Sequence, residues 1–412
     1  MRVLLLLFIW FGVCGAVRAQ NAPDEKPKPI FPQLFPNPTG TNGYEELIMA
    51  GDLAQDSKLL NDAMQPGATL TLKRKALEDG DVRRALALIQ MAFLKPIHSP
   101  RDPTKNTFDT AFFLDLAVFR NLARVFSIVE YVALADGKTG VALDAMDDCL
   151  QMSRAIPAES MINALVFVAV DAIAVKLVAS HVSQLSFRDC ERLELICNHW
   201  LRHTDSFASA LAGERNLLMR QYKETTPKPN EILEKVNPAA DDPGANDEDN
   251  PDATPEEKAL KARLRDHPGD AKKLWEQALE LIKTFYDAMI VEANKDAWER
   301  KLPDAPKAEP AVKAITDAVT PVFAQVLSKQ DQDKANLHLL GTFAALQRYR
   351  WIHRHYPESL KELREPILTQ DPFTGEFLIY KRDGDAYDLH SAGPIGAESK
   401  ARTPLYLPYR KN

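Results

Sequence analysis

Residues 159–185 read ESMINALVFVAVDAIAVKLVASHVSQL and form the most apolar stretch after the first twenty residues of the chain. Apolar side chains cover almost every side of the helix that they predict, so this helix needs neighbours all round it. A membrane span is the alternative, but Asp171 and Lys176 lie inside the stretch. Because a charge near the centre of a bilayer is costly, we expect a central helix buried by other helices.

Helical periodicity extends outward from this stretch in both directions. Apolar residues recur at three- and four-residue spacing, which predicts a helical domain over 44–223 and a helical segment over 258–335. A break is expected near His203–Asp205, and Pro321 should divide the last helix because proline removes a helical hydrogen bond. The periodic segments are 44–64, 71–94, 107–136, 141–156, 187–224, 256–302 and 311–356.

Two short stretches share one pattern, LEDGDVRRAL at 77–86 and LADGKTGVAL at 134–143. In each, an Asp-Gly pair can end one helix and turn the chain, because glycine accepts the left-handed conformation that caps a helix. The later alanine is small enough to let paired helices approach closely. The pattern is similar to the helix–turn–helix unit of tetratricopeptide repeats (TPR), so we expect TPR-like helical hairpins.

The first residues, 1–19, have the layout of a secretory signal peptide. Arg2 supplies the positive end, residues 3–13 are apolar, and small residues precede a cleavage site at Ala19–Gln20. The apolar run is too short to remain as a membrane-spanning helix. We expect an exported protein, periplasmic or extracellular, that is not an integral membrane protein after cleavage. Whether Cys14 carries a lipid stays open.

Two segments lack helical periodicity. Residues 20–43 contain six prolines and predict an extended tether. Residues 224–257 are rich in Pro, Asp, Asn and Glu and predict a disordered acidic linker. A calcium-binding loop starting at Asp247 is disfavoured, because Pro251 and Asp252 stand where such a loop needs a ligand and a glycine.

The charge balance of the chain is acidic. The formal net charge is −7 at pH 7 over 412 residues, and no dense block of Lys and Arg occurs. Nucleic acid is therefore not expected as a partner. The content of hydrophobic residues, 45%, is ordinary for a globular protein.

Three cysteines remain after removal of the leader: Cys149, Cys190 and Cys197. Cys190 and Cys197 lie two helical turns apart, about 10 Å at 1.5 Å per residue. A disulfide needs Cα atoms within about 7 Å of each other, so these two cannot pair on a regular helix. A bridge from Cys149 to either one stays open, beside the alternative of buried thiols.

The end of the chain has a different character from the rest. PESLKEL, which begins at Pro357, predicts a short helix, and DPFTG at 371–375 predicts a turn. EFLIYK and AYDLHS alternate as strands do, and RDGD between them is a hairpin signal through Asp383–Gly384. We expect this small unit to pack against the preceding helix.

The C-terminal region, 336–396, resembles the C-terminal half of type II secretion major pseudopilins. In that family a long helix ends in Tyr-Pro, followed by Leu-x-x-Leu, Asp-Pro-aromatic-x-Gly, a strand with a tyrosine, and a Tyr-x-Leu-x-Ser-x-Gly ending. The positions that fit are Tyr356, Pro357, Asp371, Pro372, Gly375, Tyr380, Tyr387, Leu389, Ser391, Gly393 and Gly396. A helical region followed by this ending is also similar to families of exported bacterial proteins with no assigned activity.

Two features of the chain differ from the pseudopilin pattern. The long helix is internal here, whereas in pseudopilins it directly follows the leader. The resemblance also implies a structural calcium held by acidic side chains, for which Asp385 and Asp388 are the candidate ligands. Ile395 stands where the pattern would supply a further aspartate, and a hard cation needs several oxygen ligands.

Motifs for catalysis are missing from the sequence. HExxH, GxSxG, Walker A and GxGxxG do not occur, so we predict neither catalytic residues nor a cofactor. His199 and His203 lie four residues apart on one face of a helix, which is the spacing of two metal ligands. Together with Asp385 and Asp388, they are the candidate metal-binding residues.

These observations favour a mainly α protein with TPR-like helical hairpins and a small C-terminal α+β cap of a helix and a β-hairpin. The function that they favour is non-catalytic: an exported protein-interaction or envelope-associated module with an unidentified protein partner. The alternative is an envelope enzyme whose site is assembled from residues far apart in the sequence.

Overall fold

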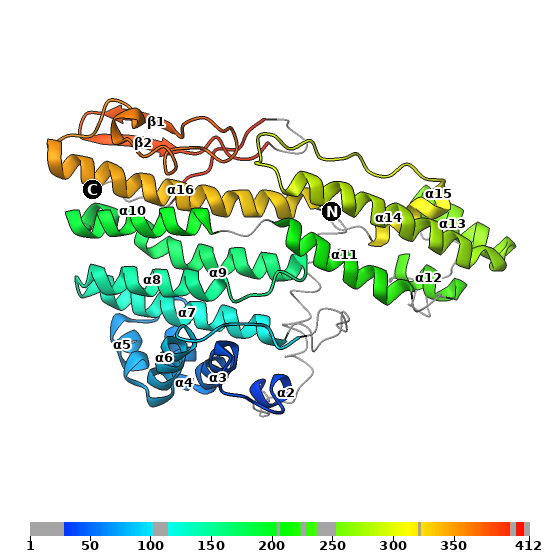
Figure 1. The fold of residues 1–412 in the computed structure, drawn as a ribbon, viewed down its shortest axis with the longest axis horizontal. Helices are drawn as coiled ribbons and strands as arrows, with labels where there is room; N and C mark the ends of the chain where they lie inside the picture. The colour runs from blue at the N-terminus through cyan, green and yellow to red at the C-terminus, as the bar shows by residue number, and fades with distance from the viewer. Residues whose placement is uncertain are drawn as a thin grey trace. The chain divides into compact units, whose positions relative to one another are not determined.

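The computed structural model describes residues 29–101, 114–203, 207–223, 228–236, 253–319, 323–395 and 401–407. The fold is mainly helical, with one small antiparallel sheet near the C-terminus, as the sequence predicts (Figure 1). The chain forms two compact units. The larger unit contains Pro29–Gly213, Ala293–Arg300 and Val326–Asn412, and the smaller contains Glu214–Glu292 and Lys301–Gln325.

The larger unit begins with a group of short helices. They are α2 (Phe31–Leu34), α3 (Gly43–Asp56), α4 (Lys58–Ala63), α5 (Leu70–Glu78) and α6 (Gly80–Ala92). Four of these helices begin after an N-cap residue whose side chain accepts a hydrogen bond from an N–H group of the first turn. These residues are Asn42, Ser57, Thr69 and Asp79. α3 packs against α6 and α7, which ties this group to the helices that follow.

The predicted tether, 20–43, is wrong over its described part. Ile30 and Phe35 are buried in the core, and the backbone N–H groups of Ile30 and Phe31 each donate to the Asp52 carboxylate at 2.9 Å. The prolines predicted an extended chain, but apolar residues between them pack into the core of the larger unit. The signal peptide, 1–19, and residues 20–28 lie outside the described residues.

Four long helices form the middle of the larger unit: α7 (Leu114–Ala135), α8 (Thr139–Ser153), α9 (Met161–Ala179) and α10 (Phe187–Arg202). A short 3-10 helix, η2 (Val182–Gln184), joins the last two. α7, α8 and α9 pack on one another, and α10 packs on α8. Figure 1 shows these helices lying side by side. α10 ends at Arg202, next to the predicted break.

The two Asp-Gly pairs behave differently. Gly137 has a φ of 70° and ends α7, where the Lys138 N–H donates to the Ala133 carbonyl at 2.8 Å, as predicted for a left-handed cap. At the other pair, Gly80 is the first residue of α6 and has no positive φ. There Asp79 turns the chain, because its carboxylate accepts hydrogen bonds from the N–H groups that follow.

α16 (Phe323–His353) returns to the larger unit and completes its core. Leu193 and Cys197 of α10 share one apolar cluster with Leu340 and Phe343 of α16. Gly341 lets the segment that carries Leu368 lie close against α16, because a Cβ at this position would lie 2.5 Å from the Leu368 side chain. The predicted helical domain, 44–223, and α16 therefore share one core, since the apolar faces of α10 and α16 cover each other.

The C-terminal cap follows α16 and lies beside its last half (Figure 1). It contains the 3-10 helix η5 (Leu360–Leu363) and the antiparallel strands β1 (Ile379–Asp383) and β2 (Ala386–His390). The hairpin is present as predicted, with its two-residue loop at Gly384–Asp385, one residue later than expected. Beyond it, Ser391 pairs with Leu405 and Ile395 with Arg402, so 401–407 of the predicted tail, 397–412, is docked.

The smaller unit contains α11 (Phe207–Lys223), α12 (Pro229–Val236), α13 (Pro255–Asp266), η4 (Pro268–Asp270), α14 (Ala271–Ala293) and α15 (Pro310–Val319); α11 and α14 extend beyond it. Its core includes Ile232 of α12, which lies within the predicted disordered linker, 224–257. That prediction is wrong for 229–236, where apolar residues at helical spacing cover α13 and α15. Residues 237–252, and also Pro321, lie outside the described residues.

Candidate functional site

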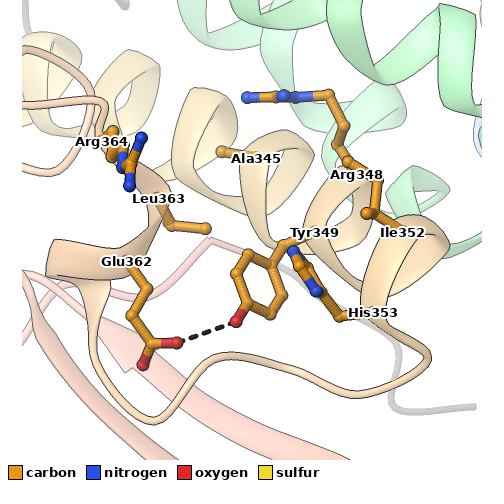
Figure 2. A pocket seen from close by; sticks show the side chains of 8 residues that line it. All are labelled: Ala345, Arg348, Tyr349, Ile352, His353, Glu362, Leu363 and Arg364. Atoms are coloured by element: carbon orange, nitrogen blue, oxygen red, sulfur yellow. Dashed lines mark hydrogen bonds between the residues drawn. The ribbon is translucent and has the colours of Figure 1, made fainter.

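An open pocket of about 400 Å³ lies where the end of α16 meets η5. Figure 2 shows its walls: α16 supplies one side and the cap segment supplies the other. The lining residues are Ala345, Arg348, Tyr349, Ile352, His353, Glu362, Leu363 and Arg364. The spacing of the α16 residues places them on one helix face, since they follow one another at three- and four-residue intervals.

Arg348 anchors the α16 wall of this pocket. Its Nε and Nη2 donate to the two carboxylate oxygens of Glu194 on α10, at 2.6 and 2.9 Å, and Glu365 lies 3.5 Å from Nη2. Burial raises the pKa of Glu194, although the charge and hydrogen bonds of Arg348 oppose this effect. A two-oxygen pair of this kind fixes the position of the guanidinium.

Glu362 connects the two walls. Its carboxylate accepts a hydrogen bond from the Tyr349 hydroxyl at 2.8 Å, which Figure 2 shows, and from the N–H groups of Glu358 and Ser359. The Tyr349 bond lowers the pKa of Glu362 and raises the pKa of Tyr349. Both groups therefore keep their ordinary charge at neutral pH, and neither is tuned to exchange a proton with a substrate.

Three further pocket residues, Ile352, His353 and Arg364, are open to solvent. The ring of His353 packs against Tyr349 at a tilt of 33°, with centroids 4.1 Å apart, and the side chain of Ile352 is 56% exposed. Arg364 has a φ of 56°, a left-handed conformation that costs a non-glycine residue on the order of 1 kcal/mol. The pocket thus offers cations and an apolar side chain to a ligand with a carboxylate and an apolar group.

The structure brings His199 and His203 together. Their rings stack with centroids 4.3 Å apart, and Nδ1 of His203 donates to the His199 carbonyl at 2.7 Å. Cys197 is fully buried, and burial raises the pKa of its thiol far from the thiolate form that a metal needs. Within the described ranges, no group of three or more His, Cys, Asp or Glu side chains has the arrangement of a metal site.

Asp385 and Asp388 lie on the exposed side of the β-hairpin. Asp385 is in the loop, and Asp388 faces Lys381 across the strands and lies 3.2 Å from Nδ1 of His390. Among the described residues, these two belong to no group of three or more His, Cys, Asp or Glu side chains that could hold a metal ion. The aspartate of the C-terminal cap that accepts several hydrogen bonds is instead Asp371, which is fully buried.

A buried polar group, which sequence reasoning did not find, joins α9 to α16. Arg154, just after α8, donates to both oxygens of Asp171 at 2.7 and 2.6 Å, and the buried carboxyl of Asp333 on α16 lies within range of the Asp171 charge. Burial raises the pKa of both carboxyls, and the charge of Asp171 adds to the rise for Asp333. Both effects favour the neutral form of Asp333. The sequence signal that could have indicated this buried polar group is the charged residue Asp171 inside an apolar helix.

α9 passes the length and composition test for a membrane-spanning helix, as the core helices of soluble proteins also do. Its Asp171 is fully buried, but only 44% of the apolar window is buried, and Ala169, Ala172 and Lys176 are exposed. The expectation of a helix covered on every side is therefore wrong for one face of α9. The three described cysteines, Cys149, Cys190 and Cys197, are free and buried. The open question of a Cys149 disulfide is therefore answered in favour of thiols. Cys14 lies outside the described residues.

Comparisons with known proteins found no match: no family model, no curated protein and no solved structure is similar to this chain.

Proposed function

We propose that the protein is a non-catalytic, exported helical protein that binds a partner protein through the pocket at the end of α16. The observation that carries this proposal is the composition of that pocket. Exposed Ile352 lies beside His353, and Arg364 stands on the opposite wall. A protein segment that combines a carboxylate with an apolar side chain would satisfy both kinds of group.

Support for export comes from the signal-peptide layout of residues 1–19. The pseudopilin-like order of residues in 336–396 makes a role at the bacterial envelope the first pathway to test. Amino-terminal sequencing of the protein recovered outside the cytoplasm is expected to start near Gln20. A chain that keeps its leader and stays in the cytoplasm would contradict export.

The alternative of an envelope enzyme has no specific observation in its favour among the described residues. The carboxyls of Asp171 and Asp333, whose pKa values burial raises, lie in the core, where a substrate cannot reach them. In the pocket, Glu362 and Tyr349 satisfy each other through a hydrogen bond.

The partner proposal is tested by affinity capture with the mature full chain. Wild-type protein and the variants Arg364→Glu and Ile352→Asp are immobilised and exposed to the exported fraction. Arg265→Glu is the matched control, because Arg265 is an exposed arginine in the smaller unit. We expect one protein to be captured by wild type and control and to be depleted about tenfold with the pocket variants, a loss of about 1.4 kcal/mol.

Capture of the same protein by all four chains would reject the pocket as the binding site. Capture of no protein by wild-type chain would reject the partner proposal as a whole. Circular dichroism of each variant checks that the substitutions leave the fold intact.

A further inference from the structure

A second, smaller cavity lies in the larger unit where α9 begins. Its volume is about 40 Å³, and its lining includes Arg154, Asn163, Ala164, Phe167 and Gln330. A water molecule needs about 10–15 Å³ of such space, so the cavity holds about three waters or an anion of three to four heavy atoms. The question is which occupant its polar groups favour.

Arg154 supplies two unused donors beside this cavity. Its Nη1 donates to both oxygens of Asp171, whereas its Nε and Nη2 are buried and donate no hydrogen bond. The N–H groups of Nε and Nη2 lie along one edge of the guanidinium and point the same way. That edge matches the two oxygens of a planar anion.

Asn163 supplies a third unused donor. The residue is fully buried, its Oδ1 accepts a hydrogen bond from the Ser160 hydroxyl at 2.6 Å, and its Nδ2 has no partner. Asn163 lies in the first turn of α9, where the helix carries partial positive charge that favours an anion. An unpaired buried donor costs on the order of 1–3 kcal/mol, so an occupant that accepts these hydrogen bonds would bind favourably.

The guanidinium is held in place by its surroundings. Its central carbon lies 4.7 Å from the ring centroids of both Phe167 and Trp200, and Asp171 fixes Nη1. The positive charge of Arg154 is offset by the Asp171 carboxylate, and the raised pKa of Asp333 favours its neutral form, so the group as a whole is close to neutral. Such a group can bind a ligand with one negative charge, whereas a ligand with two negative charges would leave an excess of buried charge.

We propose that this cavity is a binding site for a small planar monoanion, of the class of formate, nitrate or bicarbonate. The free edge of Arg154 binds two of its oxygens, and the amide of Asn163 donates to the anion. This site is separate from the pocket at the end of α16, and the proposal does not depend on the proposed function.

The test is isothermal titration of the full chain with sodium formate, with ionic strength kept constant by sodium gluconate, whose anion is too large for the cavity. We expect saturable binding of one formate per chain. Asn163→Asp places a carboxylate where the amide donor stood, and is expected to weaken formate binding at least tenfold. Asn61→Asp is the control, because it makes the same charge change on α4, where Asn61 donates to the Gln55 carbonyl.

Ala164→Val is a second variant, in case Asn163→Asp does not fold. It fills the cavity without changing the charge, and is expected to abolish formate binding. If neither formate nor nitrate gives saturable binding to the wild-type chain, the cavity holds water only and the proposal is overturned. Equal affinity in wild type, Asn163→Asp and Ala164→Val would also overturn it, since the anion would then bind elsewhere.

Discussion

The hydroxyl of Ser391 donates to Oδ1 of Asp371 at 2.9 Å, inside the C-terminal cap. The same carboxylate accepts the N–H groups of Phe373 at 2.9 Å and Ala392 at 2.6 Å. Asp371 thereby joins the turn before the hairpin to the chain after it. This gives a physical reason for an aspartate at 371 and a serine at 391.

Replacing Asp371 by alanine should therefore destabilise the cap. Three buried or partly buried donors would lose their acceptor, and hydrogen bonds to a charged group contribute about 1.5–3 kcal/mol each. We expect the free energy of unfolding to fall by about 2–4 kcal/mol, measured by urea denaturation. Asp388→Ala on the exposed face of β2 is the control and should change it by less than about 0.5 kcal/mol. Equal effects of the two variants would show that the Asp371 hydrogen bonds do not stabilise the cap.

The Asp171–Asp333 pair should make stability depend on pH. Burial raises the pKa of Asp333 in the folded protein, so its contribution is fully present below the unfolded pKa, near 4, and is lost as pH rises through the folded value. Asp333→Asn mimics the protonated form. We expect its stability relative to wild type to be constant at low pH and to improve as pH rises, by at most about 1.4 kcal/mol per pH unit.

Urea denaturation over a pH series measures this difference. Asp266→Asn, at a largely exposed aspartate in the smaller unit, serves as the control and should show no such trend. A difference between Asp333→Asn and wild type that stays constant over the whole pH range would show that folding does not raise the pKa of Asp333.

Glu130 of α7 should be replaceable with a gain in stability. It is fully buried, its two carboxylate oxygens accept no hydrogen bond, and burial raises its pKa well above the usual range. Glu130→Met is expected to raise the free energy of unfolding by about 1–3 kcal/mol, because the unsatisfied polar group is removed. Chemical denaturation at pH 7 checks this, and a loss of stability would mean that Glu130 has a binding partner in solution.

Replacement by alanine is expected to change the stability in opposite directions at Gly137 and Gly140. Gly137 has a φ of 70°, so Gly137→Ala should cost about 1 kcal/mol. Gly140 lies in α8 without positive φ, and an added Cβ would meet nothing within 4 Å, so Gly140→Ala should stabilise by about 0.5–1 kcal/mol. Thermal unfolding of the two variants separates them, and effects of the same sign would contradict the assignment of the left-handed cap.

Part of the fold could be predicted from local patterns. The hairpin was predicted because Asp-Gly lies between two alternating stretches, and the α7–α8 turn because Gly137 accepts a left-handed conformation. The tether at 29–43 and the linker at 229–236 were mispredicted, because composition cannot show that Ile30 or Ile232 packs against an apolar surface. The contacts of the candidate sites could not be predicted either, since the pocket combines α16 with the cap, and the small cavity combines Arg154 with Asn163 and Gln330.

The sequence by itself determined that the chain is mainly helical, that 159–185 contains an apolar helix, and that a hairpin follows the last long helix. These features depend on residues close together in the chain, whose spacing sets which side of an element is apolar. Only the tertiary structure decided that α10 and α16 share one core and that Asp171 meets Arg154 and Asp333. Such contacts depend on which apolar faces cover each other, and that choice is made by packing over the whole unit.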